Sequence, residues 1–229
     1  MAGLYKDINK IYEIRLSVAS TTMLNFGDKA GNVPATIISG DIDMVSLETP
    51  VCDFGLDAID FSLPGVDGNT WSLQSCRGEK GLLVMFICNH CPYVKAIRDR
   101  IVRDTRELKA LGVNTVAIMS NDPNEYEEDS FENMKKVAEE FGFDFPYLID
   151  ETQDIARAYG AVCTPDFFGY NADLKLQYRG RLDASRKEAA DPDVRRDLFE
   201  AMKQVAETGA GPVEQIPSMG CSIKWTDEG

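Results

Sequence analysis

The stretch Leu82-Leu-Val-Met-Phe-Ile-Cys-Asn-His-Cys-Pro92 decides how this chain is expected to fold. It begins with an apolar run, which is typical of a buried strand. Pro92 is typical of the first residue of a helix, where a missing N–H costs no hydrogen bond. Cys91 then lies at the helix N-cap, beside free backbone amides and the positive end of the helix dipole. A thiol in that position is stabilised as the nucleophilic thiolate, so the stretch indicates thiol redox chemistry.

Size and charge narrow the class of protein. The chain has 229 residues, of which 44% are hydrophobic and 27% charged, and this fits a globular domain with extensions. No apolar stretch reaches the roughly 18–20 residues of a membrane helix. The net charge of -14 argues against nucleic acid and anionic membranes as partners, because both attract basic surfaces. The N-terminus shows no apolar secretory segment, so we expect a cytoplasmic protein.

Strand and helix patterns alternate along most of the chain. Such alternation implies a parallel sheet core, and a late hairpin adds antiparallel strands. We therefore predict an α/β fold with a central mixed sheet, flanking helices and an N-terminal β-hairpin. The predicted elements are a hairpin of 60–63 and 70–73, a strand at 81–87, a helix at 92–111, a strand at 113–119, a helix at 130–141 capped by Ser130, a strand at 145–149, a helix at 154–159, a hairpin of 167–170 and 174–179, and a helix at 193–207.

Three segments follow from these patterns. Residues 1–43 show no periodicity, and we interpret them as an N-terminal extension that is either flexible or a leader. Residues 44–210 form the predicted domain. Residues 211–229 form a C-terminal tail that carries Cys221.

Four segments resemble one protein family. The chain is similar to the peroxiredoxin-like branch of thioredoxin-fold proteins, usually labelled the redoxin or alkyl hydroperoxide reductase/thiol-specific antioxidant family. The resemblance extends from about Ser46 to Trp225, and it implies a thioredoxin-like fold and thiol redox activity without naming a substrate. The segments that carry it are Phe86-Ile-Cys-Asn-His-Cys-Pro-Tyr-Val-Lys95, Asp150-Glu-Thr-Gln153, Tyr159-Gly-Ala-Val-Cys-Thr-Pro-Asp-Phe-Phe168 and Gly220-Cys-Ser-Ile-Lys-Trp225.

The spacing of Cys88 and Cys91 allows two assignments of the nucleophile. If Cys88 takes this role and Cys91 resolves it, as in the Cys-x-x-Cys pattern of thioredoxin, Pro92 falls near the fourth helical position, where proline is costly. If Cys91 is the nucleophile, Pro92 opens the helix and Val94 stands where thioredoxin has its second cysteine. The second assignment fits better. It also departs from peroxiredoxins, whose Pro-x-x-x-Thr/Ser-x-x-Cys pattern is not present before Cys91.

A disulfide cycle needs a partner for Cys91. The candidates are Cys88, the nearest in sequence, then Cys163, two residues before Pro165, and then Cys221 on the C-terminal tail. Each of the last two is equally well explained as a buried packing residue. We interpret the other two cysteines, Cys52 and Cys76, as structural.

Other residues are expected to support the site. The resemblance implies that Thr164-Pro165 contains a cis bond and offers the Thr164 backbone to an extended substrate peptide. His90, the single histidine, and the cations Lys95 and Arg98 are candidates for tuning the thiolate. Equally, they are explained as a solvent-facing side chain and the exposed face of an amphipathic helix.

The function expected first is a thiol-disulfide oxidoreductase, in which Cys91 attacks a disulfide of a protein or small molecule and a thiol reductant recycles the enzyme. The alternative is an antioxidant thiol peroxidase, in which Cys91 forms a sulfenic acid. A redox-inert binding module and metal binding are further alternatives. The spacing of Cys88, His90 and Cys91 argues against a metal site, and no cofactor is predicted.

Overall fold

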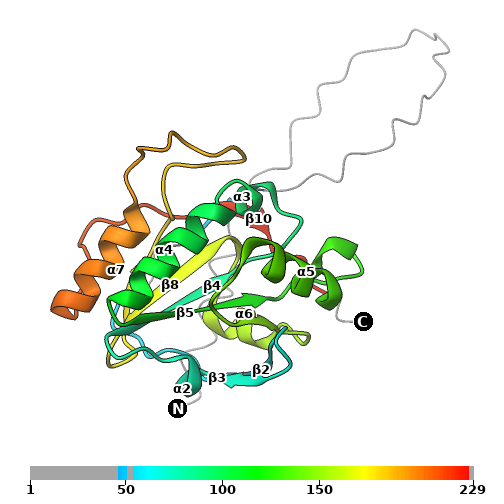
Figure 1. Ribbon diagram of the computed structural model, residues 1–229, viewed down its shortest axis with the longest axis horizontal. Helices are drawn as coiled ribbons and strands as arrows, with labels where there is room; N and C mark the ends of the chain where they lie inside the picture. The colour runs from blue at the N-terminus through cyan, green and yellow to red at the C-terminus, as the bar shows by residue number, and fades with distance from the viewer. Residues whose placement is uncertain (1–45, 51–53, 227–229) are drawn as a thin grey trace, which may run out of the picture. The chain divides into compact units, whose positions relative to one another are not determined.

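The computed structural model describes residues 46–50 and 54–226 (Figure 1). The predicted extension at residues 1–43, and Cys52, lie outside the described residues.

A five-stranded mixed sheet forms the centre of the domain. Its strands lie in the order β6-β5-β4-β8-β9. β4 pairs in parallel with β5, and β5 with β6, whereas β8 runs antiparallel to both β4 and β9, so the predicted mixed sheet is confirmed. The bounds are Gly81–Phe86 for β4, Val113–Met119 for β5, Tyr147–Ile149 for β6, Asp166–Asn171 for β8 and Leu176–Arg179 for β9.

Helices cover both faces of this sheet, which is why β4 and β5 are apolar along nearly their whole length. Apolar side chains of α4, α5 and α7 pack on one face, and those of α6, α2 and the segment around Phe61 pack on the other (Figure 1). The bounds are Leu73–Cys76 for α2, Pro92–Lys95 for α3, Arg98–Ala110 for α4, Phe131–Phe141 for α5, Asp154–Tyr159 for α6 and Asp197–Thr208 for α7.

Alternation along β4 divides the core in two. Leu83 and Met85 point into the cluster under α4, α5 and α7, whereas Leu82, Val84 and Phe86 point into the cluster on the opposite face. Successive residues of a strand point to opposite faces, so a run that is apolar throughout fills both clusters.

Two smaller sheets complete the domain. The expected N-terminal hairpin is present, with β2 at Ser62–Pro64 paired antiparallel to β3 at Thr70–Ser72. The second sheet has the order β1-β10-β7 and joins segments from the two ends of the domain, namely Ser46–Glu48 (β1), Met219–Ser222 (β10) and Cys163–Thr164 (β7). The C-terminal tail predicted at 211–229 therefore contributes a paired strand to the domain.

The predicted helix at 92–111 is wrong in one respect, because it is divided into α3 and α4. Ile97 has φ -117 and ψ 3, outside helical values, and its N–H bonds to the carbonyl of Val94, three residues back, instead of four. This tighter turn ends α3, and Ile97 itself is buried in the core. Hydrophobic spacing continues through the break, which is why the sequence did not indicate it.

The predicted start of the last helix at Asp193 is also wrong, since α7 begins at Asp197. The Asp191 carboxylate accepts a hydrogen bond from the Asp193 amide at 3.0 Å, and Val194 N–H bonds to the Asp191 carbonyl. These local bonds hold residues 191–194 in a turn and delay the helix. The 3-10 helix η1, at Glu127–Asp129, lies between β5 and α5, where no element was predicted.

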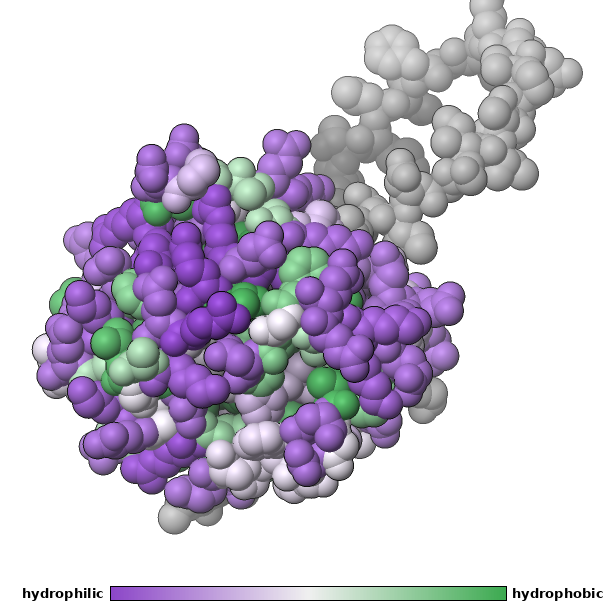
Figure 2. Space-filling model, in the orientation of Figure 1, coloured by the Kyte–Doolittle hydropathy of each residue, from purple (hydrophilic) through white to green (hydrophobic). Residues whose placement is uncertain are grey.

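Hydrophilic residues dominate the face of the domain shown in Figure 2, with small apolar areas between them. Within the described residues, none of the helices has the length and apolar character to cross a bilayer.

Candidate active site

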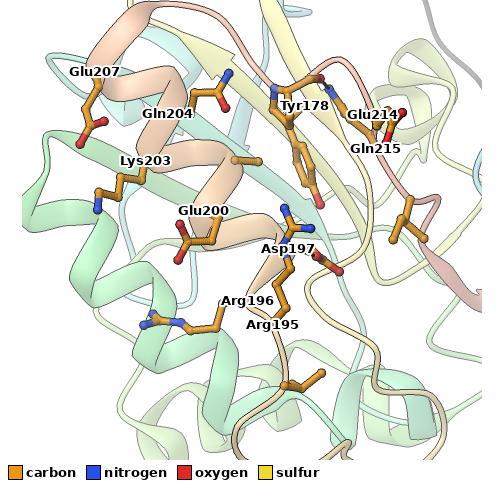
Figure 3. Close-up of a pocket in the computed structure, with 14 residues that line it drawn as sticks. Tyr178, Arg195, Arg196, Asp197, Glu200, Lys203, Gln204, Glu207, Glu214 and Gln215 are labelled. Atoms are coloured by element: carbon orange, nitrogen blue, oxygen red, sulfur yellow. Dashed lines mark hydrogen bonds and ion pairs between the residues drawn. The ribbon is translucent and has the colours of Figure 1, made fainter.

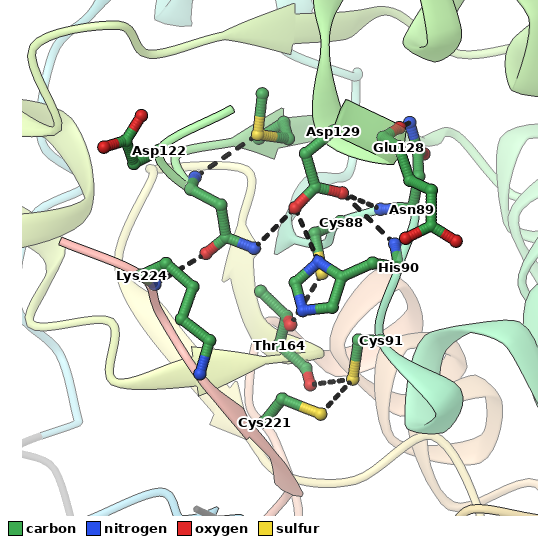
Figure 4. A network of polar contacts seen from close by, with 12 residues as sticks. Cys88, Asn89, His90, Cys91, Asp122, Glu128, Asp129, Thr164, Cys221 and Lys224 are labelled. Atoms are coloured by element: carbon green, nitrogen blue, oxygen red, sulfur yellow. Dashed lines mark hydrogen bonds and ion pairs between the residues drawn. The ribbon is translucent and has the colours of Figure 1, made fainter. Parts of the chain in front are cut away.

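Cys91 lies at the N-cap of α3 with Pro92 as the first helical residue, as predicted. Its sulfur is completely buried and faces two groups from distant parts of the chain (Figure 4). The Cys91 Sγ atom is 3.2 Å from the carbonyl oxygen of Thr164 and 2.8 Å from Sγ of Cys221. The reactive thiol predicted from the sequence is thus placed at a helix N-terminus, against a second thiol.

The register of the sheet brings Cys91 to Thr164. Phe86, the last residue of β4, pairs with Asp166, the first residue of β8, so the segments that continue from these two ends lie side by side. One of them contains Cys91 and the other contains Thr164-Pro165. The bond between Thr164 and Pro165 is cis, as predicted. The carbonyl oxygen of Thr164 faces the cysteine sulfur.

The pKa of Cys91 is held well below the range of an ordinary thiol by opposing effects. Burial raises the pKa, because a buried thiolate loses hydration. Hydrogen bonds from the thiols of Cys221 and Cys88 lower it, and so do the backbone amides of Val94 and Cys221. The Thr164 carbonyl opposes ionisation, since only the thiol form can donate to it. The thiol and amide donors act against this acceptor and favour the thiolate form of Cys91.

The pKa of Cys221 is raised, first by its hydrogen bond to Cys91 and then by burial, which favours the thiol form of Cys221. Burial also raises the pKa of Cys88 and of Cys163. Cys88 Sγ lies 3.1 Å from the Thr164 hydroxyl, and Cys163 Sγ faces the carbonyl oxygen of Pro165 at 3.7 Å. The raised pKa values favour the thiol form of these three cysteines around Cys91.

The expected ranking of the candidate partners of Cys91, with Cys88 first and Cys221 last, does not match this geometry. Cys221, placed last, is the thiol in direct contact with the Cys91 sulfur. Cys88, placed first, precedes α3 and donates toward the same sulfur, and Cys163 is turned toward Pro165. The reason is β10, which pairs with β7 and carries Cys221 across the site. The two cysteines are 130 residues apart in the sequence, so no local pattern indicated this contact.

His90 is buried, contrary to the solvent-facing alternative. Its Nδ1 atom lies 2.6 Å from a carboxylate oxygen of Asp129, and its ring stacks on Tyr126 with the centroids 3.7 Å apart. Among the described residues, Nε2 of His90 has no hydrogen-bond partner. These contacts orient the ring and fix the backbone that leads into Cys91.

Asp129 is the centre of this network and was not singled out by the sequence. Its side chain is completely buried and accepts the backbone amides of Asn89 at 2.7 Å and His90 at 3.1 Å, together with the Asn121 amide group at 3.0 Å (Figure 4). A solitary histidine next to a reactive cysteine suggests an acidic partner, but nothing local in the sequence indicates which of 38 acidic residues it is.

The two cations expected to tune the thiolate have other partners. Lys95 is half exposed and forms an ion pair with Glu128 at 3.2 Å. Arg98 is buried, donates to the carbonyl of Asn89 at 3.2 Å and lies over the ring of Phe141. Arg98 thus braces the segment before Cys91, and the helix amides and neighbouring thiols stabilise the sulfur instead.

Cys88, His90 and Asp129 bring donor atoms within 4.8 Å of one another, which is the spacing of a metal site. The donors are already engaged, however. Asp129 accepts three N–H groups in addition to its contact with the histidine, and the Cys88 sulfur contacts the Thr164 hydroxyl. The cluster is explained by its own hydrogen bonds.

Two pockets in the part of the chain that the structure describes are lined by residues other than Cys91. The pocket beside Tyr93, Pro165 and Met219 has a volume of about 20 Å³, close to that of one water molecule. A pocket of about 730 Å³ lies along α7, lined by charged residues such as Arg195 and Glu200, and none of its lining residues is a cysteine (Figure 3). The site is closed in this structure.

Residues 54–181 match the model of the AhpC/TSA family. The chain belongs to this family. The matched region contains Cys88, Cys91 and Thr164-Pro165 and ends before β10, so Cys221 lies outside it.

Solved structures resemble the chain over most of its length. An uncharacterised protein from Geobacillus kaustophilus is 45% identical, with a TM-score of 0.77, and the match covers 82% of this chain and 100% of that one. A hypothetical protein from Sinorhizobium meliloti is 38% identical, with a TM-score of 0.74, over 78% and 98% of the two chains. The thioredoxin domain of a thiol-disulfide oxidoreductase from Bacteroides vulgatus, 17% identical, matches with a TM-score of 0.52 over 68% of this chain and 99% of its own. The predicted thioredoxin-like fold is confirmed.

One curated relative has a named activity. The thiol-disulfide oxidoreductase ResA of Halalkalibacterium halodurans is 26% identical over 106 residues, which are 46% of this chain. The match spans little more than half, 56%, of the length of that relative.

Proposed function

We propose that this protein is a thiol-disulfide oxidoreductase in which Cys91 is the nucleophile and Cys221 the resolving cysteine. The observation that carries the proposal is the 2.8 Å contact between the two sulfurs, at a helix N-terminus and against the carbonyl of Thr164. Thiolate and thiol lie side by side, which is the arrangement that a dithiol needs in order to close into a disulfide. The AhpC/TSA family match and the similarity to ResA support the same chemistry.

The reaction has two exchange steps. The Cys91 thiolate attacks one sulfur of a substrate disulfide, the substrate S–S bond breaks, and the other substrate sulfur leaves as a thiolate that takes a proton from solvent. Cys221, deprotonated, then attacks Cys91 Sγ in the mixed disulfide. This step forms the Cys91–Cys221 disulfide and releases the second substrate sulfur, which is protonated as a thiol. Two electrons pass from the protein dithiol to the substrate, and an external dithiol restores the protein.

Replacement of single cysteines tests these roles. In an assay of insulin or small-disulfide reduction with a recycling dithiol, Cys91→Ser is expected to lose activity by a factor on the order of 10³ or more. Cys221→Ser is expected to accumulate a mixed disulfide on Cys91. The matched control is Cys76→Ala, since Cys76 is buried in the cluster on the opposite face of the sheet from α4. Full activity of Cys91→Ser would overturn the proposal.

Peroxide consumption by the same variants distinguishes a thiol peroxidase from a thiol-disulfide oxidoreductase. If Cys91 reduces hydrogen peroxide with a recycling thiol at a higher kcat/KM than it reduces disulfides, the sulfenic acid route replaces the exchange route.

The expected substrates are protein or small-molecule disulfides, and the expected reductant is a thiol. The cytoplasmic location stays a prediction that cell fractionation tests.

A further inference from the structure

β10 pairs with the segment that leads into the cis proline. Cys221 lies opposite Thr164 and Ser222 lies opposite Cys163 in an antiparallel register. Beyond the strand, the amide of Ile223 continues the pairing with a bond to the carbonyl of Val162 at 3.2 Å. An extended peptide that recognises a sheet edge binds by main-chain pairing of this kind. The protein's own C-terminal segment therefore occupies the edge where a substrate peptide was expected.

The position before Cys221 admits no side chain. A Cβ atom at Gly220 would overlap the carbonyl oxygen of Thr164, and it would lie 2.5 Å from the carbonyl carbon of Thr164 and 2.9 Å from the nitrogen of Pro165. All three are backbone atoms of the cis-proline segment, so they cannot move to relieve the clash as the end of a flexible side chain can. Any strand that takes the register of β10 meets the same obstacle directly before its cysteine.

Contacts on both sides of β10 hold it in this position. Before the strand, the Ser218 hydroxyl donates to the carbonyl of Pro165 at 2.7 Å. After it, the carbonyl of Lys224 accepts from the Gln153 side chain at 2.8 Å and from the amide of Asp122 at 2.9 Å. With β10 in place Cys91 has no exposed surface, so no disulfide of another protein can reach it.

We propose that β10 occupies the peptide edge beside Thr164 and cis-Pro165 as an internal competitor, and that a peptide able to displace it has glycine directly before its reacting cysteine. In this structure the site is filled by the protein's own Gly220-Cys221. The proposal rests on the function proposed above and adds the class of substrate. A protein substrate displaces β10, pairs with Thr164 in the same register and presents its cysteine sulfur to Cys91.

Displacement and resolution are then linked steps. The substrate and β10 compete for one edge, so the return of β10 removes the substrate backbone and brings Cys221 to the mixed disulfide. The attack of Cys221 on Cys91 Sγ breaks the bond to the substrate, as written above. Because only molecules with β10 displaced can bind, the apparent affinity for a peptide falls by the fraction of such molecules.

The test uses the full chain with Cys221→Ser, in which Cys91 has lost its resolving partner. Two short peptides with the sequence around Cys221, one with Gly and one with Ala before the cysteine, are activated as thionitrobenzoate disulfides. The rate of peptide attachment to Cys91 is followed by mass spectrometry. The Gly peptide is expected to react roughly tenfold faster or more, because the alanine Cβ is forced against backbone.

Alanine before the cysteine in the peptide slows its attachment to Cys91, whereas the same substitution in β10 is expected to accelerate it. Adding Gly220→Ala to Cys221→Ser weakens the docking of β10, so the Gly peptide should react faster than it does with Cys221→Ser alone. The matched control is Gly211→Ala in the same background. A Cβ at Gly211 would overlap the carbonyl oxygen of Gln177, a comparable clash outside β10 that should give no acceleration.

The outcomes separate this proposal from the one on which it rests. Equal rates for the Gly and Ala peptides overturn it, and this comparison holds even where Gly220→Ala fails to fold. Slower reaction after Gly220→Ala in folded protein also overturns it. If a small activated disulfide labels Cys91 in either case, the oxidoreductase function still stands. If Cys91 reacts neither with the peptides nor with the small disulfide, both proposals fail.

Discussion

The groups around the Cys91 sulfur lower its pKa and favour its thiolate form. Burial alone would raise the pKa of the thiol, as it does for Cys76, where the pKa is raised to about 11. At Cys91 the amides of the helix start and the thiols of Cys88 and Cys221 reverse the direction. Both cysteines are buried, and Cys76 has one donor that lowers its pKa, from Ser75, whereas Cys91 has several.

The rate of alkylation against pH tests this difference. Iodoacetamide reaches Cys91 only when β10 is displaced, and the Val94 amide and the Cys88 thiol then still favour the thiolate, so labelling should fall by much less than tenfold per pH unit between about pH 8 and pH 6. The pKa of Cys76 is raised, so its labelling should fall about tenfold per pH unit over the same range. Mass spectrometry of the two peptides measures both rates in one sample. A tenfold decrease per unit for Cys91 would contradict the assignment of the thiolate.

Asp129 is expected to matter more for stability than any single surface charge. Asp129→Asn keeps the shape but replaces one carboxylate oxygen by an NH2 group that faces an N–H donor, and it removes the buried charge, so we expect a loss of about 3 kcal/mol in the free energy of unfolding. Urea unfolding measures the loss. Glu128→Gln, at an exposed neighbour, should change stability by less than about 0.5 kcal/mol. Equal effects of the two substitutions would show that the buried network does not brace the site.

Among the elements, strands and helices with strong local patterns were predictable from the sequence. The six-residue apolar run of β4 and the proline at the start of α3 are local signals, and each was interpreted correctly. The break at Ile97 and the pairing of β10 with β7 depend on packing and on contacts distant in sequence. The sequence indicated Cys91 and Thr164-Pro165 and named Cys221 as the last of three candidate partners, whereas the contact of Cys221 with Cys91 and the position of Asp129 depend on tertiary structure.

α5 ends at a glycine, which is a local sequence signal for the end of a helix. Gly142 is the left-handed C-cap, with φ 63, and no atom lies within 4 Å of where its Cβ would be. Gly142→Ala should therefore cost about 1 kcal/mol in urea unfolding through backbone strain alone. Ser130 at the other end makes no side-chain cap bond, so Ser130→Ala should cost less than about 0.5 kcal/mol. A larger loss for Ser130→Ala than for Gly142→Ala would contradict this reading of the helix ends.

The domain as a unit combines a rigid sheet with a closed site. Both faces of the five-stranded sheet are packed, so the ends of β4 and β8 hold Cys91 and cis-Pro165 in fixed positions. The strand that covers them belongs to a separate three-stranded sheet, between β1 and β7. Displacement of β10 can thus expose the thiolate while the main sheet stays folded, which is what the proposed substrate exchange needs.

Disulfide mapping of the oxidised protein tests the pairing of Cys91 with Cys221 most directly. The full chain is treated with a limiting oxidant, the remaining thiols are alkylated, and the digest is analysed by mass spectrometry. We predict a Cys91–Cys221 disulfide that is absent from the Cys221→Ser variant. A disulfide between Cys88 and Cys91 with Cys221 left free, or a Cys91 that stays a free thiol, would contradict the role assigned to the C-terminal strand.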